Sequence, residues 1–181
     1  GRRYVALTFD DGPTPGHSEQ LLDGLRARFV SATFFLCGYR VDQCPDTVRR
    51  MAAEGHELAV HGQSHTDLHT LPAEAGRREI LGPVERIEAL TGVRPKLLRP
   101  PGGLCGGEVR AVAGELGMPI ILWNVDPQDW ACQDAAQVTR HIVDHVSDGS
   151  ILLLHDLSAA SVSAALAAVD ALQTQGYQFC T

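Results

Sequence analysis

The sequence has no long apolar run. No stretch approaches the roughly 18 consecutive apolar residues that a membrane-spanning helix needs. The chain opens on Gly1-Arg2-Arg3 and not on the apolar segment of a signal peptide. We therefore expect no membrane-spanning segment, and we expect any export signal to lie outside this chain.

Basic side chains are scarce. The chain has 15 Lys and Arg residues against 22 Asp and Glu residues, which gives a formal net charge of −7. An acidic surface repels both the phosphate backbone of nucleic acids and anionic membranes. The charge balance therefore argues against a nucleic-acid partner.

Cysteines are few and show no metal-finger spacing. The five cysteines include no Cys-x-x-Cys pair, which argues against a structural zinc ribbon, and their odd number leaves at least one thiol unpaired. Cys37 and Cys44 could close a small loop in an oxidising compartment, or all five could be small buried hydrophobic residues. The sequence leaves both interpretations open.

What the chain does have is enough apolar material for one ample core. A length of 181 residues with 44% hydrophobic content predicts a single domain over residues 1–181. Short apolar runs alternate with stretches of helical period, which is typical of repeated β-α units. We expect an α/β fold with about seven parallel strands arranged as a distorted (β/α) barrel. The expected strands are residues 4–9, 32–36, 57–60, 96–98, 119–123, 150–154 and 177–180, and the expected helices are residues 19–28, 46–54, 72–90, 107–116, 135–146 and 162–175.

Nearly all polar residues of chemical interest lie just after an expected strand. These residues are Asp10, Asp11, His61, Arg99, Asp126, Asp129 and His155. The carboxyl ends of parallel strands lie at one rim, so residues that are scattered in the sequence converge there. We expect the functional site at that rim.

Asp11, His61 and His65 form a candidate metal-binding set. One carboxylate and two imidazoles suit Zn²⁺ and similar divalent ions and leave a coordination position open for water. Cobalt, nickel or manganese could occupy similar geometry. Asp10, if it is not a ligand, can serve as a base. His69 is the alternative ligand should His65 not take part.

Each of these residues also has a plainer interpretation. Asp11-Gly12-Pro13 is a good turn sequence, and a pair of histidines four residues apart is often structural. His141 and His145 have the same spacing within an expected helix and are interpreted as solvated. Arg99 could mark an extended segment before two prolines, and Trp130 could belong to the core. His155-Asp156 could begin a helix.

Five short motifs occur in a fixed order and, taken together, are specific. They are Thr8-Phe9-Asp10-Asp11-Gly12, His61-Gly62-Gln63-Ser64-His65, Arg99-Pro100-Pro101-Gly102-Gly103, Asp126-Pro127-Gln128-Asp129-Trp130 and Leu153-Leu154-His155. Over essentially its whole length the chain resembles the polysaccharide deacetylases of carbohydrate esterase family 4, which share the NodB homology domain. The resemblance implies the fold of that family.

The resemblance also implies roles for individual residues. Asp10 would be the catalytic base, and Asp11, His61 and His65 would hold a divalent metal whose bound water attacks an acetyl carbonyl. Arg99 would pair with Asp10. His155 would be the general acid that protonates the leaving amine.

Further residues would complete the site by the same resemblance. Asp129 would orient His155 and raise its pKa. Trp130 and Leu153 would wall the pocket for the acetyl methyl group, and the backbone amide of Gly102 would stabilise the oxyanion.

The chain departs from the family pattern at two glycines. Gly62 stands where the family usually has Ser or Thr, and the missing hydroxyl is expected to loosen that loop. Gly102 stands where an aromatic residue is common, which adds backbone freedom and removes a wall of the substrate groove.

The function implied is metal-dependent removal of N-acetyl groups from a carbohydrate. We expect N-acetylglucosamine units of peptidoglycan or chitin-like glycans as the substrate, and a secreted or cell-wall-associated monomer. An acetylxylan esterase is the near alternative, because esters and amides can share this site. A carbohydrate-binding relative that keeps the fold without turnover is the alternative from another class.

Overall fold

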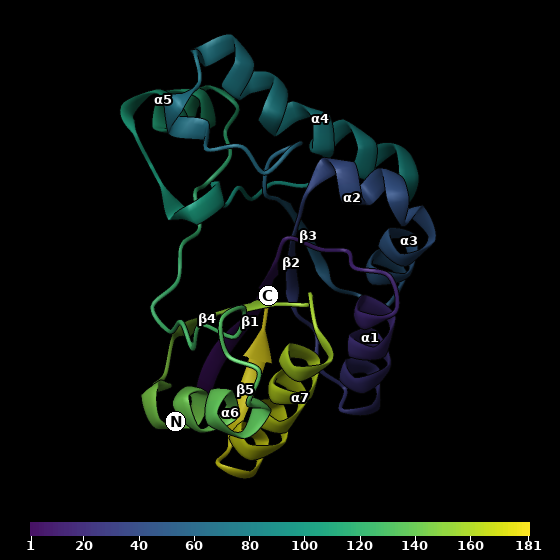
Figure 1. Cartoon of the computed structure of the whole chain (residues 1–181), viewed down its shortest axis with the longest axis vertical. Coiled ribbons are helices and arrows are strands. Elements are labelled where there is room, and N and C mark those ends of the chain that lie inside the picture. Colours follow the sequence, from purple (N-terminus) through teal and green to yellow (C-terminus); the bar gives the residue numbers. More distant parts are fainter.

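The computed structural model describes residues 1–181 and has a parallel β-sheet at its centre (Figure 1). Strand β1 (Arg3–Asp10) pairs with β2 (Thr33–Leu36), β4 (Ser150–His155) and β5 (Tyr177–Cys180), and β2 pairs with β3 (Glu57–Val60). All of these pairings are parallel, so the α/β class predicted from the sequence is confirmed.

The register of β1 brings two site residues side by side. β4 pairs with β1 from Val5 to Asp10, so β2 and β5 must share the opposite edge of β1. Asp10 and His155 are the last residues of β1 and β4 and lie opposite each other in this register. Two candidate catalytic side chains therefore start from adjacent backbone positions at the carboxyl end of the sheet.

Two expected strands do not form as regular strands. Residues 96–98 and 119–123 contribute only single parallel bridges, Val60 to Leu98 and Leu98 to Ile120, and one further bridge joins Val125 to Leu152 on β4. Prolines at positions 95, 100 and 119 flank these segments and cannot donate to a ladder. The sheet thus has five regular strands where about seven were expected. Because single bridges link its outer edges, a regular barrel is not confirmed.

The expected helices all form, with ends within three residues of the predicted ones. They are α1 (His17–Ala27), α3 (Pro45–Ala53), α4 (Ala73–Thr91), α5 (Gly107–Glu115), α6 (Ala135–His145) and α7 (Ala159–Thr174). A further helix, α2 (Gly38–Gln43), was not predicted, because six residues are too few to show a helical period. Short 3-10 turns lie at Leu68–Thr70 and Pro101–Gly103.

Helix ends follow the local sequence. Helix α4 stops at Gly92, whose φ of 73° is left-handed, as expected for a glycine at a helix end. The side chain of Asp134 caps α6 by accepting from two backbone amides, and that of Ser158 caps α7. His155-Asp156 is therefore not the start of a helix, which corrects that interpretation.

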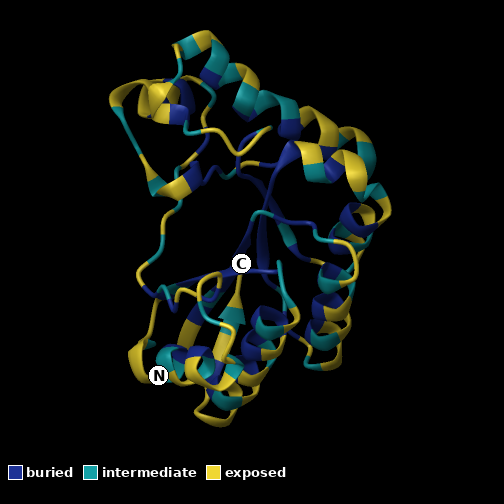
Figure 2. Cartoon of the chain, viewed as in Figure 1, coloured by how far each residue is buried: buried dark blue, intermediate teal, exposed yellow.

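One hydrophobic cluster of 36 buried residues fills the space between the sheet and the helices. Buried residues concentrate on the strands and the inner faces of helices, while exposed ones lie on the outer faces (Figure 2). Helices α6 and α7 pack together beside β5 at one end of the molecule, and α2, α3 and α4 flank the other (Figure 1). The packing leaves the carboxyl ends of β1, β3 and β4 to build a site.

The five cysteines are free thiols, and Cys37 and Cys44 do not form the disulfide considered above. Cys37 is fully buried and serves as a small apolar residue next to the site. No helix is both long and apolar enough to cross a membrane.

Candidate active site

A cleft of about 470 Å³ opens at the carboxyl ends of the strands. Eight of the ten predicted site residues line it, namely Asp10, Asp11, His61, His65, Gly102, Trp130, Leu153 and His155. The other two, Arg99 and Asp129, are fully buried directly behind this lining. Motifs from widely separated parts of the chain therefore converge as expected.

Asp11, His61 and His65 meet at one point. The Oδ1 atom of Asp11 lies 3.2 Å from Nε2 of His61 and 3.0 Å from Nε2 of His65. Ligand atoms of the three residues lie within 4.8 Å of one another. The two imidazoles face the same carboxylate oxygen, so this cluster is a candidate divalent-metal site.

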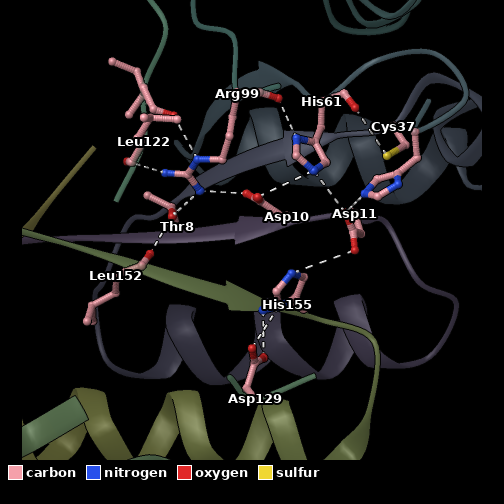
Figure 3. A network of polar contacts seen from close by, with 12 residues as sticks. Thr8, Asp10, Asp11, Cys37, His61, Arg99, Leu122, Asp129, Leu152 and His155 are labelled. Carbon is pink, nitrogen blue, oxygen red and sulfur yellow. Dashed lines mark hydrogen bonds and ion pairs between the residues drawn. The ribbon is translucent and has the colours of Figure 1, made fainter. Parts of the chain in front are cut away.

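The hydrogen bonding of these residues fits a cation. Nδ1 of His61 contacts the carbonyl oxygen of Arg99 at 2.6 Å, and a proton donated there leaves the lone pair on Nε2 free (Figure 3). Oδ1 of Asp11 is buried and has no hydrogen-bond partner. A lone pair facing an unpartnered anionic oxygen is the arrangement that a shared metal ion satisfies.

Electrostatics keep Asp11 ionised, as a metal ligand must be. Burial alone would raise its pKa, but the contacts of its carboxylate with His61 and His65 hold that pKa well below its usual range. The φ of Asp11 is 74°, a left-handed value at the first residue after β1, where the chain turns out of the strand. The turn interpretation of Asp11-Gly12-Pro13 and the ligand interpretation are therefore compatible.

Asp10 is oriented from behind by a buried cation. Nη1 of Arg99 donates to Oδ1 of Asp10 at 2.7 Å, and Oδ2 of Asp10 lies 3.6 Å from Nε2 of His61 (Figure 3). Both Asp10 and Arg99 are almost completely buried. One carboxylate oxygen is thus fixed, while the other faces the metal cluster.

The guanidinium of Arg99 is itself held on several sides. It donates to the Thr8 hydroxyl at 2.7 Å and to the carbonyl oxygens of Ile121 and Leu122 at 3.0 and 2.9 Å. Its Cζ atom lies 4.0 Å from the ring centroid of Phe35, a cation–π contact. Burial lowers the pKa of Arg99, and Asp10 opposes this shift. Arg99 is therefore a built-in counter-charge and not merely an extended residue before two prolines.

His155 has the opposite arrangement, with a buried anion behind it. Nδ1 of His155 lies 2.8 Å from Oδ1 of Asp129, and the backbone amide of His155 donates to Oδ2 of Asp129, also at 2.8 Å (Figure 3). Burial lowers the pKa of His155, but the hydrogen bond and charge of Asp129, with the charges of Asp11 and Asp10, raise that pKa on balance. Nε2 of His155 faces the cleft, 3.9 Å from Oδ2 of Asp11.

A further buried carboxylate, that of Asp156, packs against the turn that follows Asp11. Asp156 is fully buried and accepts a hydrogen bond from the Ser18 hydroxyl, which in turn accepts from the backbone amide of Thr14 at 2.7 Å. A Cβ atom at Gly12 would lie 2.6 Å from Oδ1 of Asp156. Position 12 therefore requires glycine for close packing.

The loop around Gly62 is well tied, contrary to the expected loosening. The backbone amides of Gly38 and Tyr39 donate to the carbonyl oxygens of Gly62 and Gln63 at 3.0 and 2.9 Å. Gly62 has a φ of 86°, which disfavours the Ser or Thr usual in the family. Position 62 itself is fixed by its backbone bond to α2 and not by a hydroxyl of its own.

The remaining histidines stay away from the cluster. His69 contacts Asp67 and does not join the candidate metal ligands. The rings of His141 and His145 stack on each other on α6 and have no acidic partner within ion-pair distance. His56 accepts from the amide of Ala32 in the core. His65, and not His69, is therefore the second histidine of the candidate metal cluster.

Comparison with protein families matches residues 1–121 to the family described as polysaccharide deacetylase. The chain belongs to the polysaccharide deacetylase family. The peptidoglycan-N-acetylmuramic acid deacetylase PdaC of Bacillus subtilis is 37% identical over 180 residues, which are 99% of this chain and 38% of PdaC. A solved structure of PdaC matches with a TM-score of 0.94 at 37% identity and covers 99% of this chain and 87% of that one.

Two further relatives share the family. A peptidoglycan-N-acetylglucosamine deacetylase of Bacillus cereus is 36% identical over 99% of this chain and 86% of its own length. A chitooligosaccharide deacetylase of a Bradyrhizobium strain is 38% identical over 86% of this chain and 72% of its own length. The chain spans only 38% of the length of PdaC, less than half of that protein.

The cleft of this deacetylase-family chain includes residues that sequence reasoning missed. Trp123 and Leu157 line it, and the Trp123 ring packs where a Cβ atom of Gly103 would lie, 2.8 Å away. Trp130 is 61% exposed, so the core interpretation of this residue is wrong. The signal for Trp123 was its place at the end of an expected strand, the same position that singled out the polar residues.

Proposed function

We propose that residues 1–181 form one catalytic domain that removes N-acetyl groups from a carbohydrate with the help of a divalent metal. The observation that carries the proposal is the pair of oppositely charged supports in one cleft, with Arg99 behind Asp10 and Asp129 behind His155. Such an arrangement separates a proton acceptor from a proton donor next to a metal site. That is what hydrolysis of an amide requires.

The proposed substrate is an acetylated glycan, with N-acetylglucosamine units of peptidoglycan or of chitin-like chains as the favoured class. The names of the relatives, which act on peptidoglycan and on chitooligosaccharides, support this class. The site is an open cleft, which suits a chain-like substrate better than an enclosed pocket would. We further propose a monomer that works outside the cell or in the cell wall, where such glycans occur.

Asp11, His61 and His65 would hold the metal, and their mixed oxygen and nitrogen ligand set favours Zn²⁺, with Co²⁺, Ni²⁺ or Mn²⁺ as alternatives. A divalent ion there lowers the pKa of water and polarises the acetyl carbonyl. Asp10 takes the proton of the attacking water through Oδ2, because Arg99 occupies Oδ1.

His155 supplies the proton that the leaving nitrogen needs. Its Nδ1 is engaged by Asp129, so the proton on Nε2 points into the cleft. As the carbon–nitrogen bond breaks, this proton passes to the amine, and acetate and a free amino sugar result. The backbone amide of Gly102 would stabilise the oxyanion. Trp130 and Leu153 would enclose the acetyl methyl group.

The test is acetate release from N-acetylglucosamine oligomers by the metal-free protein and after addition of Zn²⁺. We expect no release without metal and recovery when Zn²⁺ is restored, because Asp10 alone neither lowers the pKa of the attacking water nor polarises the acetyl carbonyl. Release that persists in the presence of a strong chelator would contradict the proposed mechanism. An anomalous-scattering map showing a metal between Asp11, His61 and His65 would support it directly.

The esterase alternative is separated by a substrate comparison. An amide nitrogen needs protonation before it leaves, whereas an ester oxygen needs less help. The firmly oriented His155 therefore favours amide hydrolysis. Faster acetate release from acetylxylan than from glycan amides would favour the esterase. Glycan binding by calorimetry without any acetate release would favour the binding protein.

A further inference from the structure

The two histidines of the candidate metal site are held very differently. His61 directly follows β3, its side chain is 3% exposed, and its Nδ1 is fixed by the carbonyl oxygen of Arg99. The His65 side chain is 44% exposed, and no comparable contact fixes it from behind. The position of His65 therefore depends on the backbone of its own loop.

That backbone is in an unfavourable conformation. His65 has a φ of 61°, in the left-handed region that residues with a Cβ atom seldom adopt. Such conformations persist only where the surrounding structure enforces them. Something outside the loop must therefore hold its second half.

The first half of the loop is held by α2. Besides the two backbone hydrogen bonds from Gly38 and Tyr39, the Gln63 side chain packs against glycines on two helices. A Cβ atom at Gly38 or Gly82 would lie 2.0 or 2.9 Å from Oε1 of Gln63. These contacts end at Gln63, two residues before the ligand.

The second half is held by one carboxylate on α4. The backbone amide of Ser64 donates to Oε2 of Glu79 at 2.9 Å, and the Ser64 hydroxyl donates to Oε1 at 2.8 Å. Glu79 forms no ion pair, so both of its oxygens are committed to the residue that directly precedes His65. Charged acceptors make the stronger hydrogen bonds of this kind.

We propose that Glu79 is a positioning residue of the metal site. Its carboxylate fixes Ser64 and thereby keeps His65 in the strained conformation in which Nε2 reaches Asp11. The proposal rests on the metal-dependent function proposed above. It adds to that function a residue from α4 that does not line the cleft and whose hydrogen bonds go to Ser64 and not to a metal ligand.

The test measures Zn²⁺ affinity of the full chain by competition with a chromophoric chelator. Loss of a partner that orients a metal ligand typically lowers metal affinity about 10- to 100-fold, and we expect this loss in Glu79→Ala. Glu79→Gln keeps one acceptor oxygen and should lose less. Glu85→Ala is the matched control, because Glu85 lies on the same helix, is exposed and forms no ion pair or side-chain hydrogen bond.

A second variant and a second readout separate positioning from folding. Ser64→Ala removes the hydroxyl but keeps the amide, so its Zn²⁺ affinity should fall less than that of Glu79→Ala. The melting temperature of metal-free Glu79→Ala should match that of the metal-free parent chain. Its acetate release should recover when Zn²⁺ is raised to saturation. If Glu79→Ala does not fold, the Zn²⁺ affinities of Glu79→Gln and Ser64→Ala test the proposal instead.

Parental Zn²⁺ affinity in Glu79→Ala, or an equal loss in Glu85→Ala, would overturn the proposal. Failure of the parent chain to bind Zn²⁺ would overturn it as well. Tight Zn²⁺ binding without acetate release would refute the proposed function and leave the positioning role intact. The affinity measurement thus separates the two proposals.

Discussion

The Asp10–Arg99 pair and the His155–Asp129 pair are built alike and charged oppositely. In each, one side chain faces the cleft at the end of a strand, and its partner is 0% exposed behind it. The hidden partner is a cation behind Asp10 and an anion behind His155. The difference teaches that one cleft can place a carboxylate against a buried cation and an imidazole against a buried anion, so that the sign of the buried partner distinguishes the two groups.

The two supports also differ in how they are anchored. Arg99 reaches across to Thr8 on β1 and to backbone oxygens of the 121–122 segment. Both carboxylate oxygens of Asp129 bond to His155, one to its ring and the other to its backbone amide. Arg99 therefore ties distant segments together, whereas Asp129 acts on His155 alone.

Among changes to the two pairs, neutralising Asp10 should lower acetate release the most. Asp10→Asn keeps the shape but removes both the proton acceptor and the counter-charge of Arg99, so we expect acetate release to fall by about 10³-fold or more. The measurement is initial acetate release at saturating Zn²⁺. Zn²⁺ affinity, held by Asp11 and the two histidines, serves as the control and should change far less. Activity equal to that of the parent chain would refute the role of Asp10 as base.

Removing the imidazole of His155 should cause the next largest fall in acetate release. His155→Ala eliminates the proton donor, and we expect a fall of about 10²- to 10³-fold on an N-acetyl substrate. An acetyl ester with a good leaving group should be less affected, since its oxygen leaves with less protonation. Acetate release from both substrates measures this ratio. An equal loss on the two substrates would argue against His155 as the acid.

Neutralising Asp129 should shift a pH profile more than it lowers the maximum rate. Asp129 contributes to raising the pKa of His155 above the ordinary value of 6.5, so the protonated acid persists to higher pH. Activity should be lost as pH rises through this pKa, and Asp129→Asn should move the loss to lower pH. Rates across the pH range at saturating substrate and Zn²⁺ measure the shift. An unmoved alkaline limb would mean that Asp129 does not tune His155.

The smallest effect should come from the exposed wall of the cleft. Trp130→Ala removes an exposed apolar side chain that forms no hydrogen bond to either charged pair, so we expect a rise in KM of a few-fold to about 10-fold, with kcat changed less. Steady-state kinetics on N-acetylglucosamine oligomers separate the two constants. A large fall in kcat alone would instead place Trp130 in the reacting centre.

Much of this site could be predicted because its residues lie next to recognisable strands. Asp10 and His155 follow apolar runs, and parallel pairing then brings the ends of those runs together. The expected strands at residues 96–98 and 119–123 failed for a local reason, since nearby prolines limit each to isolated bridges. An apolar run in the sequence indicates that a segment is buried, but it does not show how many hydrogen bonds that segment makes to a neighbouring strand.

The contacts that support the site could not be predicted in the same way. Glu79 lies on the polar face of a helix, where a solvated carboxylate is the ordinary expectation. Its bond to Ser64 spans 15 residues, and that of Arg99 to Thr8 spans 91. Pairings across such distances depend on how helices pack on the sheet, which local patterns do not determine.

The single bridges at Ile120 and Val125 affect how easily one wall of the cleft opens. Between them the chain carries Trp123, which lines the cleft, and is joined to its neighbours by a few hydrogen bonds in place of a continuous ladder. Segments held in this way open locally at lower free energy than the strands beside them. Amide hydrogens there should exchange with solvent well before those of β1 and β4. The wall of the cleft that carries Trp123 would then be the side that yields first, and the carbonyl oxygens of Ile121 and Leu122 that hold Arg99 lie in the same segment.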